Sequence, residues 1–422
     1  MENSRHREHL LSPRALTFYI CVAALCYNMP CFKYAIPYTV QGLLLLSSYI
    51  IFFYESNFQT RNLFISLACS LLLFIITIFF TYNGYWTEAI NEIIRFYRFL
   101  APGYLYLLLR HYTFSHKKLG LIILSIFSAI IFYTSTRTII ELNTNPMVAR
   151  LLAAGIVADD LAIIRAANVA GYQLSYAIGF ATIICLAFAL HYKSKYSKLT
   201  FTFAYLFLFY FVFRTQYTTL LILTTLGSYI VMYIYSRNKS WKQLFIVLSL
   251  FLAVAVPFFM LMLSQLHDRE TSMISMKFTQ LLDFSRTGDL SAVGNRPSLY
   301  LEAFDRFLIS PLIGNPVYIY NQANISMYHS HSTLFSYLQS TGLVGTLCVY
   351  VPLFCLYNAI MHNMKEISPF LKECYKLVFV MLIILSVVNP IDYCFEISFI
   401  VFLFIPLLID QTRNPIRKNH DH

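Results

Sequence analysis

Charged residues are scarce in this chain of 422 residues: Asp, Glu, Lys and Arg make up 12% of it, whereas hydrophobic residues make up 58%. Soluble domains carry about twice this charged fraction, so the composition excludes an ordinary soluble protein. Runs such as 63–80 and 244–263 are apolar on all sides. A membrane-crossing barrel strand would instead alternate polar and apolar residues over about ten positions. The runs therefore indicate transmembrane helices.

Cysteine is missing from every segment that would lie outside the membrane, because all nine cysteines fall in the apolar runs or at their ends. This excludes a disulfide framework and a thiolate metal site there. Internal repeats, glycine-rich linkers and low-complexity tails are also missing. The first apolar run lacks a small-residue cleavage site, so we expect no cleavable signal peptide. These absences favour a single transmembrane domain over residues 1–422.

Twelve apolar runs are long enough, or nearly so, to cross a hydrocarbon core of about 30 Å. They lie at 15–32, 35–54, 63–81, 88–109, 119–135, 172–191, 199–213, 217–235, 244–263, 332–359, 374–388 and 394–409. Basic residues gather between alternate runs, and the positive-inside rule then places both termini in the cytoplasm. The net charge of +11 reflects this orientation and anionic lipid, and it requires no nucleic-acid partner. The sequence thus predicts an all-α, multi-pass membrane protein of about 12 transmembrane helices.

Two long segments, 136–171 and 264–331, lie outside the membrane in this topology. They are the only segments with room for a folded site outside the bilayer. The second precedes the tenth predicted transmembrane helix and holds three of the 11 histidines. The short outer turns contain only Lys33 and Arg214 as basic residues. We therefore expect a large, helical outer loop to carry the functional site.

A helix is predicted within 294–314. Pro297 suits a first helical turn, and Pro311 and Gly314 end the run. The apolar residues of one face are Tyr300, Phe304, Phe307 and Leu308. Such a face suits a helix that lies on the membrane surface. Arg296 stands at its N-terminus, where free N–H groups and the helix dipole favour a phosphate group. Alternatively, the same side chain extends to lipid phosphates.

Two histidines, His329 and His331, stand at the outer end of the predicted helix 332–359. Imidazole has an unperturbed pKa of about 6.5 and can transfer a proton near neutral pH. A histidine at this depth is equally suited to the membrane interface. Gly342 and Gly345 follow at a spacing that lets membrane helices approach closely. The pattern thus leaves open a catalytic and a structural interpretation.

The stretch from His331 to Gly345 has a polar residue after the histidine, nine further residues and Gly-x-x-Gly. It resembles the signature of the O-antigen ligase and polymerase superfamily. Arg296 and the residues that follow it resemble that family's second element, an Arg leading a helix that ends in Pro-Leu-x-Gly. Both elements occur in the family's order, and the match covers 294–345.

The resemblance implies a metal-independent glycosyltransferase without a cofactor, in the bacterial inner membrane. Its donor and acceptor would be oligosaccharides linked to undecaprenyl diphosphate, and its partners would include the lipid bilayer, a chain-length regulator and a flippase. His331, with His329 beside it, would serve the acceptor hydroxyl as base or positioning group. Arg296 and Arg214 would hold the diphosphate, although Arg214 stands earlier than the family's usual Arg. Fixed guanidinium groups stabilise the negative charge that grows on a departing diphosphate.

Two further sets of charged residues allow more than one interpretation. Arg95 and Arg98, in the predicted helix 88–109, either pair with glutamates of their own helix or line the cavity that receives the diphosphate. Acidic pairs in the outer segments offer a divalent metal site as an alternative to a metal-free one. These pairs are Asp159 with Asp160 and Asp268 with Glu270.

The first functional expectation is a polymerase that joins repeat units of O-antigen, capsule or exopolysaccharide. The alternative of the same class is an O-antigen ligase, which transfers the finished chain to lipid A core. The shared motifs do not separate these two enzymes. A lipid or polysaccharide transporter is the alternative from another class. Transporters commonly show internal repeats and polar helix breaks at the membrane midplane, and this sequence instead concentrates its polar residues in one outer loop.

Overall fold

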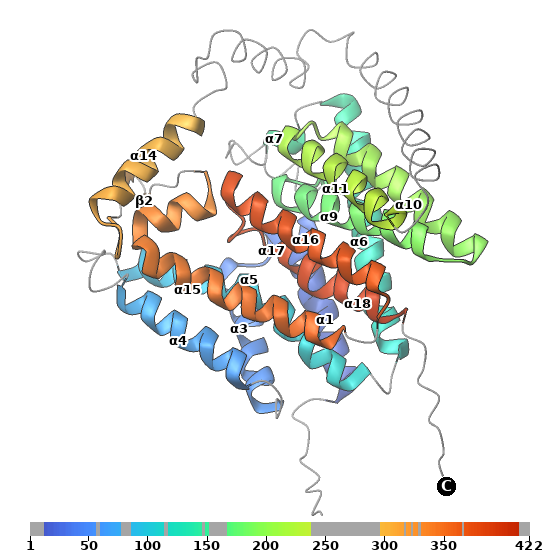
Figure 1. Ribbon diagram of the computed structural model, residues 1–422, viewed down its shortest axis with the longest axis horizontal. Coiled ribbons are helices and arrows are strands. Elements are labelled where there is room, and N and C mark those ends of the chain that lie inside the picture. Colours follow the sequence, from blue (N-terminus) through green and yellow to red (C-terminus); the bar gives the residue numbers. More distant parts are fainter. Residues whose placement is uncertain are drawn as a thin grey trace, which may run out of the picture.

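The computed structural model describes residues 12–55, 60–76, 86–113, 117–145, 148–151, 167–237, 296–315, 318–321, 324–327, 331–364 and 367–412. These residues are almost entirely helical, which confirms the expected all-α class (Figure 1). The helices are α1 Pro13–Asn28, α2 Pro30–Ala35, α3 Tyr38–Glu55, α4 Thr60–Ile76, α5 Trp86–Thr113, α6 Lys117–Thr144, α7 Val148–Leu151, α9 Tyr172–His191, α10 Lys195–Arg214, α11 Thr218–Ser236, α14 Arg296–Ile309, α15 Thr333–Asn363, α16 Pro369–Val388, α17 Phe395–Ser398, the π-helix η3 Phe399–Phe404 and α18 Ile405–Asp410.

Among the described residues, five helices are long and apolar enough to cross a membrane: α6, α9, α10, α11 and α15. Their apolar length matches the hydrocarbon thickness of a bilayer, as a membrane protein requires. The predicted ninth helix, 244–263, lies outside the described residues. The last predicted helix, 394–409, consists of α17, η3 and α18 in succession.

Helix α9 forms the centre of the bundle. In its apolar part 89% of the residues are buried, against 33% in each of its neighbours α10 and α11. Small residues allow this packing: a Cβ atom at Gly179 would lie 2.3 Å from a methyl group of Leu220 in α11. Helices in a membrane pack closely where such residues occur. Small residues such as Gly179 thus let α11 pack closely against α9.

Helix α6 extends beyond the predicted run 119–135 and ends at Thr144. The added turns are polar but helical, and Arg137 donates to Glu141 one turn later, over 3.2 Å. Such pairs stabilise a helix by a few tenths of a kcal/mol. The prediction took the end of hydrophobicity as the end of the helix, and it therefore placed this boundary too early.

The helix predicted in 294–314 is confirmed as α14, but its apolar face is divided. Tyr300 stacks on Phe335 of α15, with ring centroids 5.2 Å apart, and its hydroxyl donates to the Val388 carbonyl over 2.9 Å. Phe304 and Leu308 are instead 44% and 56% exposed. One side of α14 therefore packs on the bundle beside the start of α15 (Figure 1), and another is free to face lipid.

A short hairpin follows α14 in the chain. Strands β1 (Tyr318–Asn321) and β2 (Asn324–Met327) pair antiparallel, with Tyr318 opposite Met327. The prediction of a purely helical outer loop did not include this hairpin. Its strands are four residues each, which is too short for periodicity to reveal them.

Candidate functional site

The chain turns sharply at His331, immediately before α15. Its φ angle of 58° is in the left-handed region, which costs free energy for a residue with a Cβ atom. Ser332 then caps the helix: its hydroxyl accepts from the Phe335 N–H over 3.2 Å and donates to the Ser386 carbonyl over 3.3 Å. Ser332 is fully buried, whereas His331 is exposed. The imidazole is thus accessible at the entrance of a firmly anchored helix.

The first turn of α15 is bonded to the turn that follows α16. The Thr333 hydroxyl donates to Asp392 Oδ1 over 3.1 Å and accepts from the Ile391 N–H over 2.7 Å. The Thr333 N–H also points to the Asn389 carbonyl, 3.4 Å away. Both the proton and an acceptor site of the hydroxyl are therefore engaged, which fixes its orientation.

The two arginines of α5 have different surroundings. Arg95 Nη1 lies 3.8 Å from Asp392 Oδ2, so the structure brings Arg95 to the start of α15. Arg98 is only 1% exposed; its guanidinium lies 4.8 Å from the Phe395 ring centre and 3.3 Å from the Tyr27 hydroxyl. Arg98 thus lies between α1 and α17. Of the two, Arg95 is the one that belongs with His331.

Arg214, at the end of α10, is held against α6. Its Nη2 donates to Asn143 Oδ1 over 2.7 Å, and its Nη1 lies 3.2 Å from the Tyr210 hydroxyl. The guanidinium also faces the Tyr210 ring at 5.9 Å. These contacts are with α6 and with its own helix, whereas the helix that follows His331 is bonded to the turn after α16.

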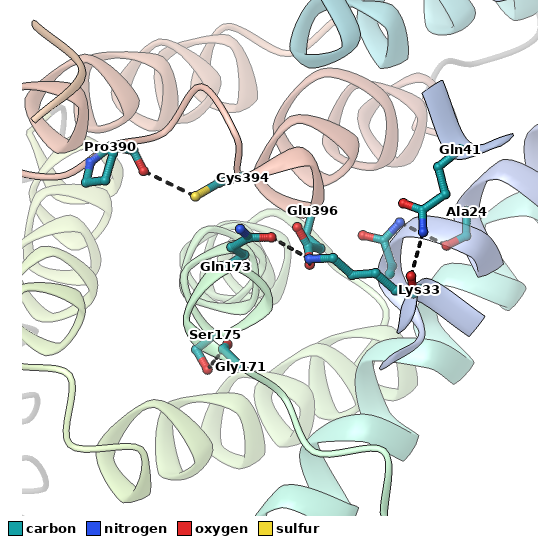
Figure 2. Close-up of polar contacts among 10 residues, drawn as sticks. Ala24, Lys33, Gln41, Gly171, Gln173, Ser175, Pro390, Cys394 and Glu396 are labelled. Atoms are coloured by element: carbon teal, nitrogen blue, oxygen red, sulfur yellow. Dashed lines mark hydrogen bonds and ion pairs between the residues drawn. The ribbon is translucent and has the colours of Figure 1, made fainter. Parts of the chain in front are cut away.

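A buried ion pair that the sequence analysis missed lies at the same end of the bundle (Figure 2). The Lys33 ammonium of α2 donates to Glu396 of α17 and to Gln173 of α9. Burial tends to lower the pKa of Lys33, but the Glu396 carboxylate outweighs it and the pKa is raised. The ammonium thus stays charged at neutral pH. The sequence signal for this pair is an isolated Glu at the start of the predicted helix 394–409 together with an isolated Lys in an outer turn.

Gly342 interrupts α15 in its first third. With φ 63° and ψ −164° it has a conformation essentially restricted to glycine. The N–H groups beyond the break find partners outside the helix: Leu343 donates to the Pro311 carbonyl over 2.8 Å and Val344 to the Leu312 carbonyl over 3.1 Å. The segment after α14 is therefore bonded to the break in α15. The prediction that Gly342 allows close packing agrees with this contact, but its partner is the backbone of residues 312–314, and glycine spacing alone does not show its positive φ.

Gly314 is the counterpart of Gly342, with φ 78°. A Cβ atom at Gly314 would lie 2.4 Å from the Ser340 carbonyl carbon, and one at Gly342 would lie 2.4 Å from that of Leu312. The Asn315 N–H completes the contact by donating to a carbonyl of α15 over 2.7 Å. We call this contact of 311–315 with the break at Gly342 the glycine seam. It joins the helix that begins at Arg296 to the helix that follows His331.

Gly345 differs from Gly342, because it is helical. A Cβ atom there would lie 3.3 Å from a methyl group of Leu73 in α4, and 2.1 Å from the side chain of Thr341 one turn earlier. For this glycine the contact with another helix agrees with the small-residue packing predicted from the sequence.

Polar side chains fill the part of α15 between its cap and the break. The buried ones are Thr333, Ser336, Tyr337, Gln339, Ser340 and Thr341. Gln339 is 1% exposed, and within the described residues neither polar atom of its amide has a hydrogen-bond partner; the same holds for the Ser340 hydroxyl. Such groups cost about 1–3 kcal/mol each when they stay unpaired. This first part of α15 therefore buries a series of polar side chains directly after His331.

Some predicted site residues are only partly described. Arg296 is the first residue of α14, but its side chain lies outside the described part, and so does all of His329. The acidic pairs at 159–160 and 268–270 also lie outside it. Within the described ranges, no three His, Cys, Asp or Glu side chains are grouped so that they could hold a metal ion.

A scan against models of protein families finds no match to this chain, and a search of the curated proteins finds none either. The chemistry of the site therefore rests on its own residues. It has an exposed imidazole at a helix entrance, a guanidinium tied to that helix by a carboxylate, and a second helix, beginning with an arginine, fastened to the first. This arrangement offers an accessible proton acceptor at the start of a helix that an ion pair helps to hold.

Replacing Gly342 with alanine should destabilise the protein. The added Cβ atom would force the backbone out of a conformation whose strain for other residues is roughly 1–3 kcal/mol, and it would meet the Leu312 carbonyl. We expect a lower thermal unfolding temperature in detergent. Gly42→Ala is the matched control, because its nearest contact would be an ordinary 3.7 Å. Equal unfolding temperatures for the two variants would refute the seam.

Proposed function

We propose that this protein is a polymerase of undecaprenyl-diphosphate-linked oligosaccharide repeat units, acting at the outer face of a bacterial inner membrane. The observation that carries the proposal is the glycine seam. The two sequence elements that resemble the O-antigen ligase and polymerase superfamily end in Gly314 and Gly345, and they are in backbone contact through Gly342. This backbone contact supports a shared role for the two elements.

The proposed topology has 12 transmembrane helices with both termini in the cytoplasm. Residues that it places in the outer segments or at the outer ends of the helices contact one another. These contacts are Cys31 with Asn168, Arg214 with Asn143, and Thr333 with Asp392. On the proposed inner side, the Tyr106 hydroxyl donates to Asp410 over 2.6 Å. Each of these contacts joins residues that the topology places on the same side of the membrane, which supports the proposed order of membrane crossings.

In the proposed reaction, a hydroxyl oxygen of the acceptor repeat unit attacks the anomeric carbon of the sugar that is linked to the donor diphosphate. The bond from that carbon to the diphosphate oxygen breaks, and undecaprenyl diphosphate leaves with the electron pair. The hydroxyl proton passes to the His331 imidazole and then to water. Arg296 and Arg214 bind the departing diphosphate. Guanidinium groups keep their charge at any physiological pH, so they can do this without a metal.

The break in α15 is the one observation that favours a transporter, because discontinuous helices line many transport sites. However, the N–H groups that the break frees at Leu343 and Val344 are already bonded to Pro311 and Leu312. They are not available to coordinate a substrate. The exposed end of the same helix, at His331, remains accessible, which favours chemistry at the membrane surface.

The topology predicts which introduced cysteines react from outside. In a Cys31→Ala background, Thr144→Cys at the end of α6 should react with a membrane-impermeant maleimide on intact spheroplasts, because Thr144 is exposed on the outer side. Tyr196→Cys at the start of α10, where the side chain is 84% exposed, should react only after lysis. The reverse pattern would overturn the orientation.

Arg296→Ala should abolish polymerisation, and Arg296→Lys should restore little, because lysine keeps the charge but loses the two-pronged geometry for phosphate oxygens. The readout is the polysaccharide ladder of a deletion strain that expresses each variant at equal level. Core with a single repeat unit supports a polymerase, whereas bare core with accumulated lipid-linked polymer indicates a ligase. A normal ladder in Arg296→Ala would exclude a role in holding the diphosphate.

His331→Ala should lower the polymerisation rate by roughly 10²–10⁴, the usual contribution of a general acid or base. The rate is measured on lipid-linked repeat units in proteoliposomes, per folded protein and with a chelator present. His329→Ala serves as the comparison and should lose less. Full activity of His331→Ala, or loss of wild-type activity in the chelator, would contradict the proposed mechanism.

A further inference from the structure

We infer that Asp392 is a positioning residue of this site: through Thr333 it holds the start of α15, and thereby His331, in the reactive geometry. The inference rests on the proposed function. Asp392 belongs to the short turn between α16 and α17, far in sequence from both elements that resemble the superfamily. Its contacts, and not its sequence neighbourhood, give it this role.

The Asp392 carboxylate is shared between two helices. Its Oδ1 accepts the proton of the Thr333 hydroxyl over 3.1 Å, and its Oδ2 lies 3.8 Å from Arg95 Nη1. Asp392 is only 6% exposed. A buried carboxylate needs such partners, and Arg95 supplies the opposite charge. One side chain thus brings α5 and α15 to the turn after α16.

The site needs this support because His331 is strained. A non-glycine residue at φ 58° persists only where the surrounding structure holds it there. The hydroxyl of Thr333, two residues later, is bonded on both sides by the same turn, to Asp392 and to the Ile391 N–H. Without the carboxylate, the first turn of α15 loses one of its attachments, the one that fixes the proton of the Thr333 hydroxyl, and His331 can relax toward an extended conformation. A displacement of about 1 Å at a reacting group can cost on the order of 100-fold in rate.

The proposed role of Asp392 depends on the geometry of its bond with the Thr333 hydroxyl. Conservative variants can therefore distinguish this role from a general effect on protein stability. Thr333→Val keeps the shape and removes the hydroxyl, while Thr333→Ser keeps the hydroxyl. Asp392→Asn keeps an acceptor for Thr333 but loses the charge that faces Arg95. Glu141→Gln is the control: Glu141 pairs with Arg137 at the same end of the bundle over 3.2 Å and lies outside this network.

The test is steady-state polymerisation in proteoliposomes with lipid-linked repeat units extracted from the producing cells. Thr333→Val should lower kcat roughly 10- to 100-fold, up to the effect of displacing a reacting group by about 1 Å. KM should stay unchanged, because Thr333 and Asp392 are both buried and act through the position of His331. Thr333→Ser should recover most of the rate, and Asp392→Asn should fall between the two. The double variant Asp392→Asn, Thr333→Val should be no slower than Thr333→Val alone.

Equal rates for Thr333→Val and wild type, or equal losses for Thr333→Val and Thr333→Ser, would overturn the inference. The Thr333 pair tests the hydroxyl, whose bonds to Asp392 and to the Ile391 N–H are both lost in Thr333→Val, and a wild-type rate for Asp392→Asn would overturn the role of the carboxylate. A loss that also appears in Glu141→Gln would likewise reject a specific role. If His331→Ala is fully active, the proposed function itself fails. If His331→Ala is inactive while Thr333→Val is normal, only the positioning role of Asp392 is wrong.

Discussion

The structure depends on one requirement of a membrane interior: each buried backbone N–H and C=O group needs a partner within the protein. The helical hydrogen bonding of α15 is interrupted at Gly342. The N–H groups of Leu343 and Val344 donate instead to the Pro311 and Leu312 carbonyls in the segment after α14. These hydrogen bonds can form only because Gly314 and Gly342 lack a Cβ atom and so allow the two backbones to come into contact. As a result, the helix that begins at Arg296 and the helix that follows His331 are held as one unit.

Charged side chains at the end of the bundle near His331 also have partners within the protein. Lys33 is bonded to Glu396, Arg95 faces Asp392, and Arg98 lies against the Phe395 ring. Both carboxylates and the ring belong to the turn and short helix after α16, so this segment organises cations from α2 and α5. Buried charges cost several kcal/mol unless they are paired, and proteins keep them in membranes mainly for function. These pairings give the turn and short helix after α16 an ordered set of charged contacts.

Local signals were sufficient for some of these features. Pro297 and Gly314 mark the two ends of α14 because they act through the backbone of their own residues: Pro297 is its second residue, and the helix ends at Ile309, before Gly314. The division of its apolar face was not predictable in this way. Tyr300 stacks on Phe335 while Phe304 is exposed, and this depends on where α15 passes. Likewise, Gly342 and Gly345 look alike in sequence, yet one breaks the helix and the other packs against α4.

The sequence by itself determined that the chain is helical and apolar, that a helix follows Arg296, and that His331 precedes another helix, because these properties depend on composition and on residues a few positions apart. Only the tertiary structure decided that Thr333 contacts Asp392, that Lys33 pairs with Glu396, and that Gly314 lies against Gly342. Each of these contacts joins residues from separate elements. Their partners are selected by the packing of whole helices, and no short sequence pattern encodes that packing.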